Sequence, residues 1–195
     1  MSSHAVTAPR ETQRSRVDTT LGMALFIGSW SMAFATLFLS FLVLRHREPA
    51  WPPPGLPLPS VALAGLGTLV LLASSVLVSR ALVRLRAGAS GFTALWGAAL
   101  ALALGFAALQ AWLWVDVWTV GLRPDSGNYA GLFYMLTWFH ALHVVCGIAA
   151  LLWVWAGALR GTIGPARLSP AVGSALFWHF VDAVWVVLFL GFFVF

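Results

Sequence analysis

Four ionisable side chains lie within stretches of the chain that are otherwise apolar. His140 and His143 are three residues apart in one stretch, and His179 and Asp182 are three apart in another. Residues with this spacing share one face of a helix. Asp182 lies about ten residues into its stretch, or about 15 Å along a helix, near the middle of a hydrocarbon layer about 30 Å thick. A charge there costs about 2.5–3.5 kcal/mol on the mildest scale, so we expect these groups to face protein.

Three kinds of chemistry fit these side chains. Three imidazoles and a carboxylate on facing helices could ligate zinc, iron or haem. The same groups could form a proton relay or a transport path. In the third interpretation they hydrogen-bond one another and hold two helices together, and Trp178 and Trp185, on the stripe of Asp182, could donate to its carboxylate. The spacing favours the third, because His-x-x-His is a weak metal signal and the chain shows neither repeats nor clearly broken helices.

Five long apolar stretches must position these residues. Of the 195 residues, 61% are hydrophobic and 9% are charged, with a mean hydropathy of +0.90. This composition is typical of a polytopic helical membrane protein. A span needs about 20 apolar residues, and the stretches that meet this length are Leu21–Leu44, Ser60–Val83, Gly91–Val115, Tyr129–Ala158 and Ala171–Phe195. We predict an all-α fold with a polar N-terminal tail, residues 1–19, and a single five-helix transmembrane domain, residues 20–195.

The arginines predict how these helices cross the membrane. The chain has no lysine, so arginine alone supplies the positive charges behind the net charge of +5. The arginines lie in the loops and at the ends of the apolar stretches, where they can meet lipid headgroups. One side would hold Arg10, Arg14, Arg16, Arg80, Arg84, Arg86, Arg160 and Arg167, and the other Arg45, Arg47 and Arg123. Because cytoplasmic loops carry the excess of positive residues, we expect the N-terminus in the cytoplasm and the C-terminus outside.

Other polar residues give weaker signals. Gln110 is predicted to hydrogen-bond a neighbouring helix. Ser74, Ser75 and Ser79 are predicted to bond carbonyl groups of their own helix, as hydroxyl groups in transmembrane helices often do.

Three strings of the sequence resemble subunit III of the haem–copper respiratory oxidases. The string LFWHFVDAVW at residues 176–185 resembles the closing Trp-His-Phe-x-Asp-x-x-Trp helix of that family. The string FHALHVVCG at residues 139–147 resembles its Phe/Thr-His-Gly-Leu-His-Val helix, and GMALFIGS at residues 22–29 resembles the start of its first shared helix. The resemblance covers residues 20 to 195, which is nearly the whole chain.

The resemblance implies the five-helix form of this subunit, a multi-pass protein of the bacterial inner membrane whose C-terminus is periplasmic. Such a subunit packs on catalytic subunit I and other oxidase subunits, in some cases within a respiratory supercomplex. It holds structural phospholipids and supports proton uptake and stability in turnover. It binds no haem or copper, which reside in the partner subunits, and nothing points to nucleic acid as a partner. We therefore expect no catalytic, cofactor-binding or metal-ligating residue here. The predicted structural polar cluster comprises His140, His143, Trp178, His179, Asp182 and Trp185.

Two positions depart from the family pattern. Trp30 stands where members often have a membrane-embedded Glu, and Leu113 stands where many have a second one. We therefore expect this chain to share the family's role in assembly. We do not expect it to share any chemistry that depends on these two glutamates. Alternatives within the same fold are subunit III of a ubiquinol oxidase and an accessory protein of nitric oxide reductase. Alternatives of other classes are a stand-alone haem- or metal-binding membrane enzyme and a transporter.

Overall fold

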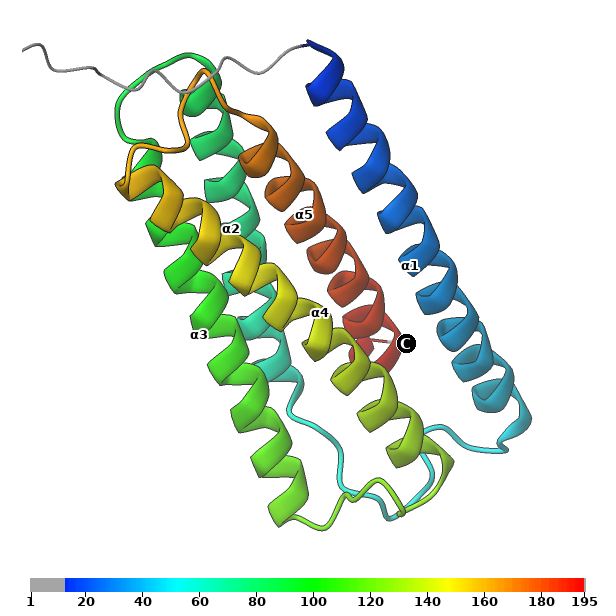
Figure 1. Ribbon diagram of the computed structural model, residues 1–195. Helices are drawn as coiled ribbons and strands as arrows, with labels where there is room; N and C mark the ends of the chain where they lie inside the picture. The colour runs from blue at the N-terminus through cyan, green and yellow to red at the C-terminus, as the bar shows by residue number, and fades with distance from the viewer. Residues whose placement is uncertain (1–12, 195) are drawn as a thin grey trace, which may run out of the picture.

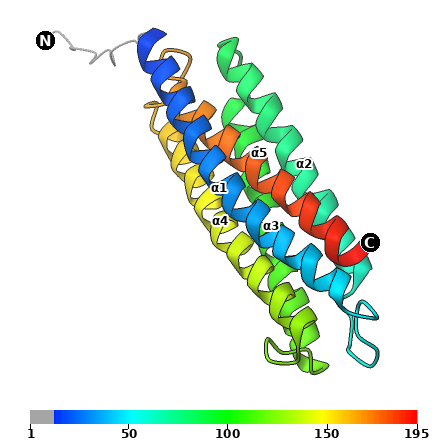
Figure 2. The same ribbon diagram turned by 90° about the vertical axis from the view of Figure 1, so that its right-hand side faces the viewer.

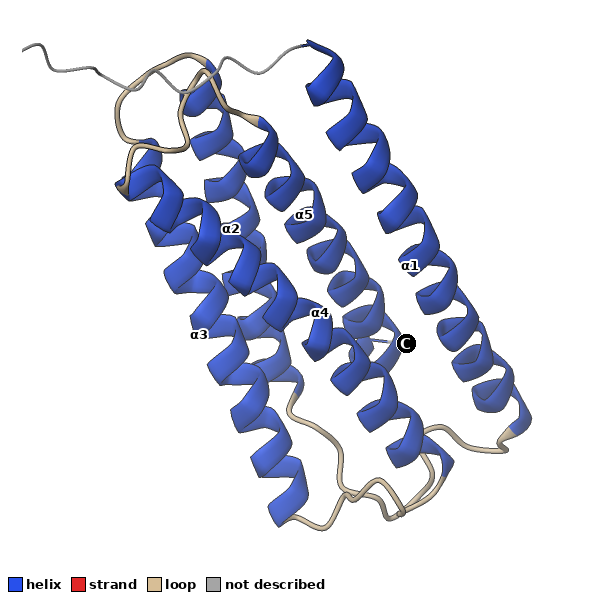
Figure 3. Ribbon diagram, in the orientation of Figure 1, coloured by secondary structure: helices blue, strands red, loops and turns tan. Residues whose placement is uncertain are grey.

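The computed structural model describes residues 13–194, and that part of the chain is helical with connecting loops and no strand (Figures 1 and 3). Within it, five helical segments are long and apolar enough to cross a membrane. The predicted all-α fold with five spans is confirmed. The elements are α1 (Gln13–Arg47), α2 (Val61–Arg86), α3 (Phe92–Thr119), α4 (Asn128–Leu159), α5 (Ser169–Phe189) and a final π-helical segment, η1 (Leu190–Val194).

The helix ends lie close to the predicted ones, with one clear difference at the start of the chain. The first span was predicted to begin at Leu21, but α1 already begins at Gln13. A helix satisfies its own backbone hydrogen bonds whatever its side chains, so polar residues can continue it beyond the apolar stretch. The division into a tail, residues 1–19, and a domain, residues 20–195, stays a prediction, and residues 1–12 lie outside the described part.

Successive helices run in opposite directions, and α5 lies between the others (Figures 1 and 2). α5 contacts α1, α2 and α4, whereas α1 stands at the edge of the bundle and packs on α5 and, less extensively, on α4. α2 and α3 form the most extensive helix pair. The helix that carries His179 and Asp182 therefore packs on three of the other four.

The arginines of the described part gather at the two ends of the bundle as the sequence predicted. Arg84 and Arg86 end α2 at the same end of the bundle as the α4–α5 loop, which holds Arg167 (Figure 1). Arg47 ends α1 at the opposite end, where the α3–α4 loop holds Arg123. Which of these ends faces the cytoplasm stays a prediction.

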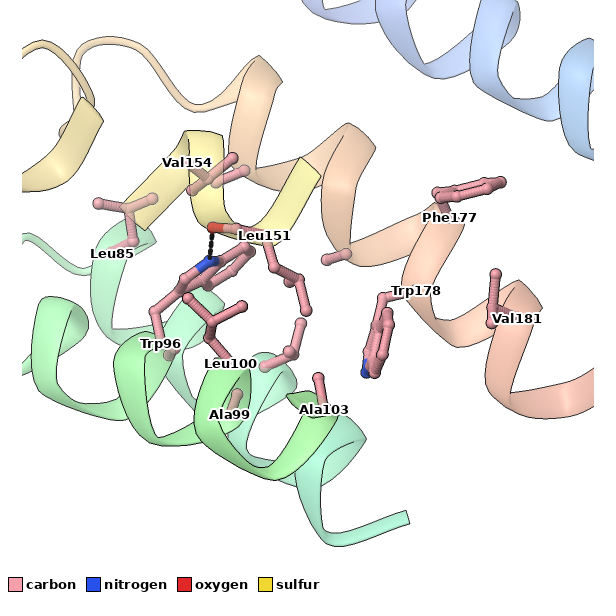
Figure 4. Packing of buried hydrophobic residues seen from close by; sticks show 14 of the residues in the cluster. Leu85, Trp96, Ala99, Leu100, Ala103, Leu151, Val154, Phe177, Trp178 and Val181 are labelled. Atoms are coloured by element: carbon pink, nitrogen blue, oxygen red, sulfur yellow. Dashed lines mark hydrogen bonds between the residues drawn. The ribbon is translucent and has the colours of Figure 1, made fainter. Parts of the chain in front are cut away.

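The main core lies where α2, α3, α4 and α5 meet (Figure 4). The indole Nε1 of Trp96 donates a 3.0 Å hydrogen bond to the Leu151 carbonyl oxygen, which joins α3 to α4. Trp178 of α5 is fully buried and lies against α4 at Gly147, where a Cβ would stand 2.8 Å from Trp178 Cε3. Small residues let helices approach this closely in lipid, so Gly147 sets the α4–α5 distance.

Candidate functional site

Trp185 links three helices near the middle of the bundle. Its indole Nε1 donates a 2.9 Å hydrogen bond to Thr68 Oγ1 of α2, and Thr68 donates in turn to the Ala64 carbonyl oxygen. The His140 ring of α4 stacks on Trp185, with ring centroids 5.4 Å apart and an interplanar angle of 29°. Phe106 of α3 meets the same indole edge-on at 5.0 Å. One side chain of α5 thus contacts α2, α3 and α4.

Asp182 faces α2. Its side chain is 7% exposed and lies beside Ser75 and His179, the two groups that interact with its carboxylate. Ser75 Oγ and Asp182 Oδ1 nevertheless form no hydrogen bond of good geometry within the described residues. The carboxylate is therefore placed at the α2–α5 contact, although the sequence suggested a contact between α5 and α4.

His179 also meets α2. Its Nε2 lies 3.1 Å from Ser79 Oγ, within hydrogen-bond distance. Ser79 is exposed on the bundle surface and His179 is half-buried. Since Ser75 and Ser79 are four residues apart on α2, and α5 runs antiparallel to it, the two serines match Asp182 and His179 in order.

The prediction that the α2 serines bond carbonyl groups of their own helix was wrong at all three positions. Ser75 Oγ has no hydrogen-bond partner in the described part. Ser79 Oγ lies within hydrogen-bond distance of His179 instead of a carbonyl of its own helix, and Ser74 donates to the Ala99 carbonyl oxygen of α3 at 3.0 Å. Partners on α3 and α5 stand within reach because α2 packs on both helices. The predicted interhelical bond of Gln110 is also missing at its Nε2, which has no partner in the described part.

His143 lies on the side of α4 that faces α1. Its Nδ1 is 2.8 Å from the Phe139 carbonyl oxygen one turn earlier. Trp30 of α1 meets the imidazole edge-on at 4.4 Å, and Phe34 meets it at 5.0 Å. Trp30, which stands where family members often have Glu, thus makes an aromatic contact with α4.

The spacing allowed Trp178 and Trp185 to donate to Asp182, and neither does so among the described residues. Trp178 Nε1 has no hydrogen-bond partner among residues 13–194, and Trp185 donates to Thr68. Trp178 fills the core against Gly147 of α4, so packing decides where its indole points.

The six predicted residues therefore form separate interhelical contacts. His143 of α4 meets α1, and His140 of α4 stacks on Trp185 of α5, which also contacts α2 and α3. Trp178 of α5 packs on α4, and His179 and Asp182 of α5 meet α2. Within residues 13–194, no three His, Cys, Asp or Glu side chains come together as metal ligands would. The metal-ligating alternative has no ligand set there. Sequence reasoning missed Thr68, Ser75 and Ser79 as the partners of α5, although their positions on one face of α2 were a usable signal.

A family model described as cytochrome c oxidase subunit III matches residues 2–195. The chain belongs to the cytochrome c oxidase subunit III family. Its similarity to a cytochrome c oxidase subunit 3 of Synechocystis sp. is 33% identity over 171 residues, which covers 87% of this chain and 72% of the relative. A cytochrome c oxidase subunit 3 of Bacillus subtilis is 32% identical over 174 residues, covering 87% and 82%. That of Thermostichus vulcanus is 29% identical over 171 residues, covering 87% and 83%.

Membership of the cytochrome c oxidase subunit III family agrees with the fold. The chain is a multi-pass membrane protein with the subunit III role, and the family associates with other oxidase subunits. The resemblance seen in the two histidine-containing strings, residues 139–147 and 176–185, is confirmed. Both strings supply contacts between α4 or α5 and neighbouring helices.

Proposed function

We propose that the chain is the non-catalytic subunit III of a respiratory haem–copper terminal oxidase, a cytochrome c oxidase of a bacterial inner membrane. The observation that carries this proposal is the match of the subunit III family model to nearly the whole chain, residues 2–195. The subunit sits with its N-terminus in the cytoplasm and its C-terminus in the periplasm. It packs on the catalytic subunit, which holds the haem and copper.

The contacts in the membrane support a structural role for the polar residues. Buried polar groups in lipid are retained where they face protein, because an unpaired group there is costly. Here His143 of α4 meets α1, whereas Trp185 and His179 of α5 both meet α2. We infer that together they fix the helices in one arrangement, so that the subunit offers its partners a rigid surface.

A pocket at one end of the bundle suits a structural phospholipid. It has a volume of about 650 Å³ and lies between α1, α4 and α5. Met23, Phe26 and Trp153 supply apolar walls for an acyl chain, and Arg167 at the arginine-rich end supplies a charge for a lipid phosphate. Basic groups near the membrane surface attract anionic lipids by about 1 kcal/mol each.

The subunit would then support proton uptake indirectly, by packing on the catalytic subunit and by holding lipid. Trp30 and Leu113 carry no charge at the positions where many family members have Glu, and Trp30 packs on His143. We infer that the subunit preserves turnover by stabilising its neighbour, with no proton carried by these two side chains.

The test is the composition of the complex that this chain enters. The chain would be tagged, extracted from its native membrane in mild detergent, and analysed by mass spectrometry and visible absorption. The expected result is co-purification with the haem–copper catalytic subunit of a cytochrome c oxidase. Absence of any such subunit would overturn the proposal, as would a Soret band stoichiometric with the isolated chain. A nitric oxide reductase or a ubiquinol oxidase in the preparation would assign the chain to that complex instead.

A further inference from the structure

Within residues 13–194, one side of α5 is not covered by another helix. Both α1 and α2 pack on α5 but make no extensive contact with each other, and α5 is visible between them in Figure 2. Four residues at helical spacing form this open face of α5: Leu176, His179, Ala183 and Val187. His179 is half-buried and the other three are exposed. In a membrane, the open face must therefore meet either lipid or another protein.

The open face is hollowed on its α1 side. A pocket of about 360 Å³ lies between α1 and α5, and its lining includes Ala183 of the open face together with Ser31 and Ala35 of α1. Ala24 and Gly28 continue the same stripe of small, exposed residues toward the start of α1. Nothing lies within 4 Å of a Cβ at Gly28. Small residues on one stripe let another helix approach closely in lipid, so the hollow has room for side chains of a further helix.

The α2 side of the open face carries a polar group. His179 lies ten residues after the start of α5, about 15 Å along the helix, and its Nε2 is 3.1 Å from Oγ of the exposed Ser79 of α2. The other ring nitrogen, Nδ1, has no hydrogen bond among the described residues, and it is not sealed inside the bundle as the nitrogens of His140 are. A neutral imidazole offers both a donor and an acceptor, whereas an acyl chain offers neither. Ionisable groups at this depth are retained where they face protein, so a protein partner fits the open face better than lipid does.

We propose that one transmembrane helix of the oxidase catalytic subunit packs along the open face of α5 and offers a polar side chain to His179 Nδ1. This inference rests on the proposed function. In its most apolar stretch α1 is only 11% buried, against 28–39% for the other four spans, so α1 has the most surface left for this helix. A two-fold contact between two copies of the chain would set the hollow against itself, whereas a single helix from a partner presents a convex surface that fills it.

Photo-crosslinking in the native membrane tests this placement. Benzoylphenylalanine would replace Leu176 or Val187 of the open face, one at a time, and the full chain would be purified through a tag after irradiation. Leu104 is the control position, because its side chain is also exposed and its helix, α3, packs on α2 and α4 away from the open face. Crosslinks to the catalytic subunit are expected from Leu176 and Val187 and not from Leu104. Crosslinks of the open face to lipid alone or to a second copy would overturn the inference, as would equal crosslinking from Leu104.

The same purification separates failure of this inference from failure of the proposed function. If the catalytic subunit is absent from the purified material, the proposed function fails. If the catalytic subunit is present but is not crosslinked to the open face, only this inference fails.

Gly28→Leu tests the hollow from the α1 side. The chain alone has free space at this position, so its unfolding in detergent is expected not to change. The added side chain would occupy the place of the partner helix, so the ratio of this chain to haem, in oxidase purified through its catalytic subunit, is expected to fall several-fold. Gly22→Leu is the matched control, because a Cβ there also meets nothing within 4 Å and a residue six positions away lies on another face of the helix.

Full retention of the Gly28→Leu chain would overturn the inference. An acyl chain beside His179 Nδ1 in a high-resolution map of the unmodified complex would also overturn it, and a polar side chain of the catalytic subunit there is the expected result. If Gly28→Leu destabilises the chain alone, the crosslinks and the map decide the question.

Discussion

The indole nitrogen of Trp185 lies 2.9 Å from the hydroxyl oxygen of Thr68, and this bond joins α5 to α2 in the interior of the bundle. Two further side chains of α5 lie next to serines of α2. Going toward the start of α5, Asp182 lies beside Ser75 and His179 lies within hydrogen-bond distance of Ser79. Antiparallel packing brings each of these α5 side chains to a hydroxyl group on one face of α2.

The Trp185–Thr68 bond is expected to contribute measurably to stability. Trp185→Phe and Thr68→Val each remove one partner, and a double-mutant cycle isolates their interaction. Interhelical hydrogen bonds in membranes average about 0.6 kcal/mol, with a maximum of about 1.7, so we expect a coupling energy in this range. Reversible unfolding in detergent or bicelles would measure it. Trp112→Phe, at an exposed indole, is the control, and a cycle that closes to zero would show that the bond contributes nothing.

Gly147→Ala is expected to push α4 and α5 apart. The new Cβ would stand 2.8 Å from Trp178 Cε3 and 3.0 Å from Cζ3, and this indole is fully buried. Overpacking of this kind costs about 1–3 kcal/mol. Gly28→Ala on α1 is the matched control, because nothing lies within 4 Å of a Cβ there. Unfolding free energies measured in the same detergent should separate the two variants. Equal stability of both would mean that the close approach at Gly147 is unimportant.

Trp30→Ala is expected to loosen α1 from the bundle. Trp30 contacts His143 at 4.4 Å and Phe139 at 5.8 Å between ring centroids, and aromatic pairs contribute about 0.5–1.5 kcal/mol beyond their buried area. Hydrogen exchange of α1 in the detergent-solubilised protein should become faster. Met32→Ala, at a side chain that is 73% exposed, should leave the exchange unchanged. If the two variants behave alike, α1 is held by contacts elsewhere.

Arg167→Gln is expected to reduce retention of anionic phospholipid in the purified complex. Loss of one basic group at the pocket between α1, α4 and α5 should weaken binding by about 1 kcal/mol, a several-fold change in affinity. Native mass spectrometry at matched detergent concentrations would count bound lipids. Arg160→Gln alters an exposed arginine in the same connecting loop that does not line this pocket, so its lipid content should not fall. Equal lipid retention in all three proteins would contradict this placement of the lipid.

The five spans could be predicted because a membrane imposes simple rules on the chain. A helix must satisfy its backbone internally and must be about 20 apolar residues long, and both requirements are visible in the sequence. The N-terminal end of α1 was misplaced, because helical structure at Gln13 does not require apolar side chains. The length of an apolar stretch thus predicts the part of a helix that crosses the membrane. It does not predict how far the helix continues into polar sequence.

The partners of the polar residues could not be predicted in the same way. Spacing shows that His179 and Asp182 share a face of α5, and it gives their depth, but it does not say which neighbour that face meets. The structure turns this face toward α2 and its serines, Ser75 and Ser79. Rotation of a helix about its axis depends on the packing of all five helices, including the close contact at Gly147.

The central claim is that these polar groups hold the subunit together and take no part in redox chemistry, and Asp182→Ala tests it most directly. Removing one side of a buried polar pair costs about 1–3 kcal/mol, so we expect this subunit to be retained less well. The oxidase would be purified through its catalytic subunit, and quantitative mass spectrometry and visible absorption would give the ratio of this chain to haem. Asp125→Ala, at an exposed loop carboxylate, is the control. We expect a lower ratio for Asp182→Ala alone, with haem and copper per catalytic subunit unchanged. Full retention of the subunit together with a loss of haem or copper would contradict it.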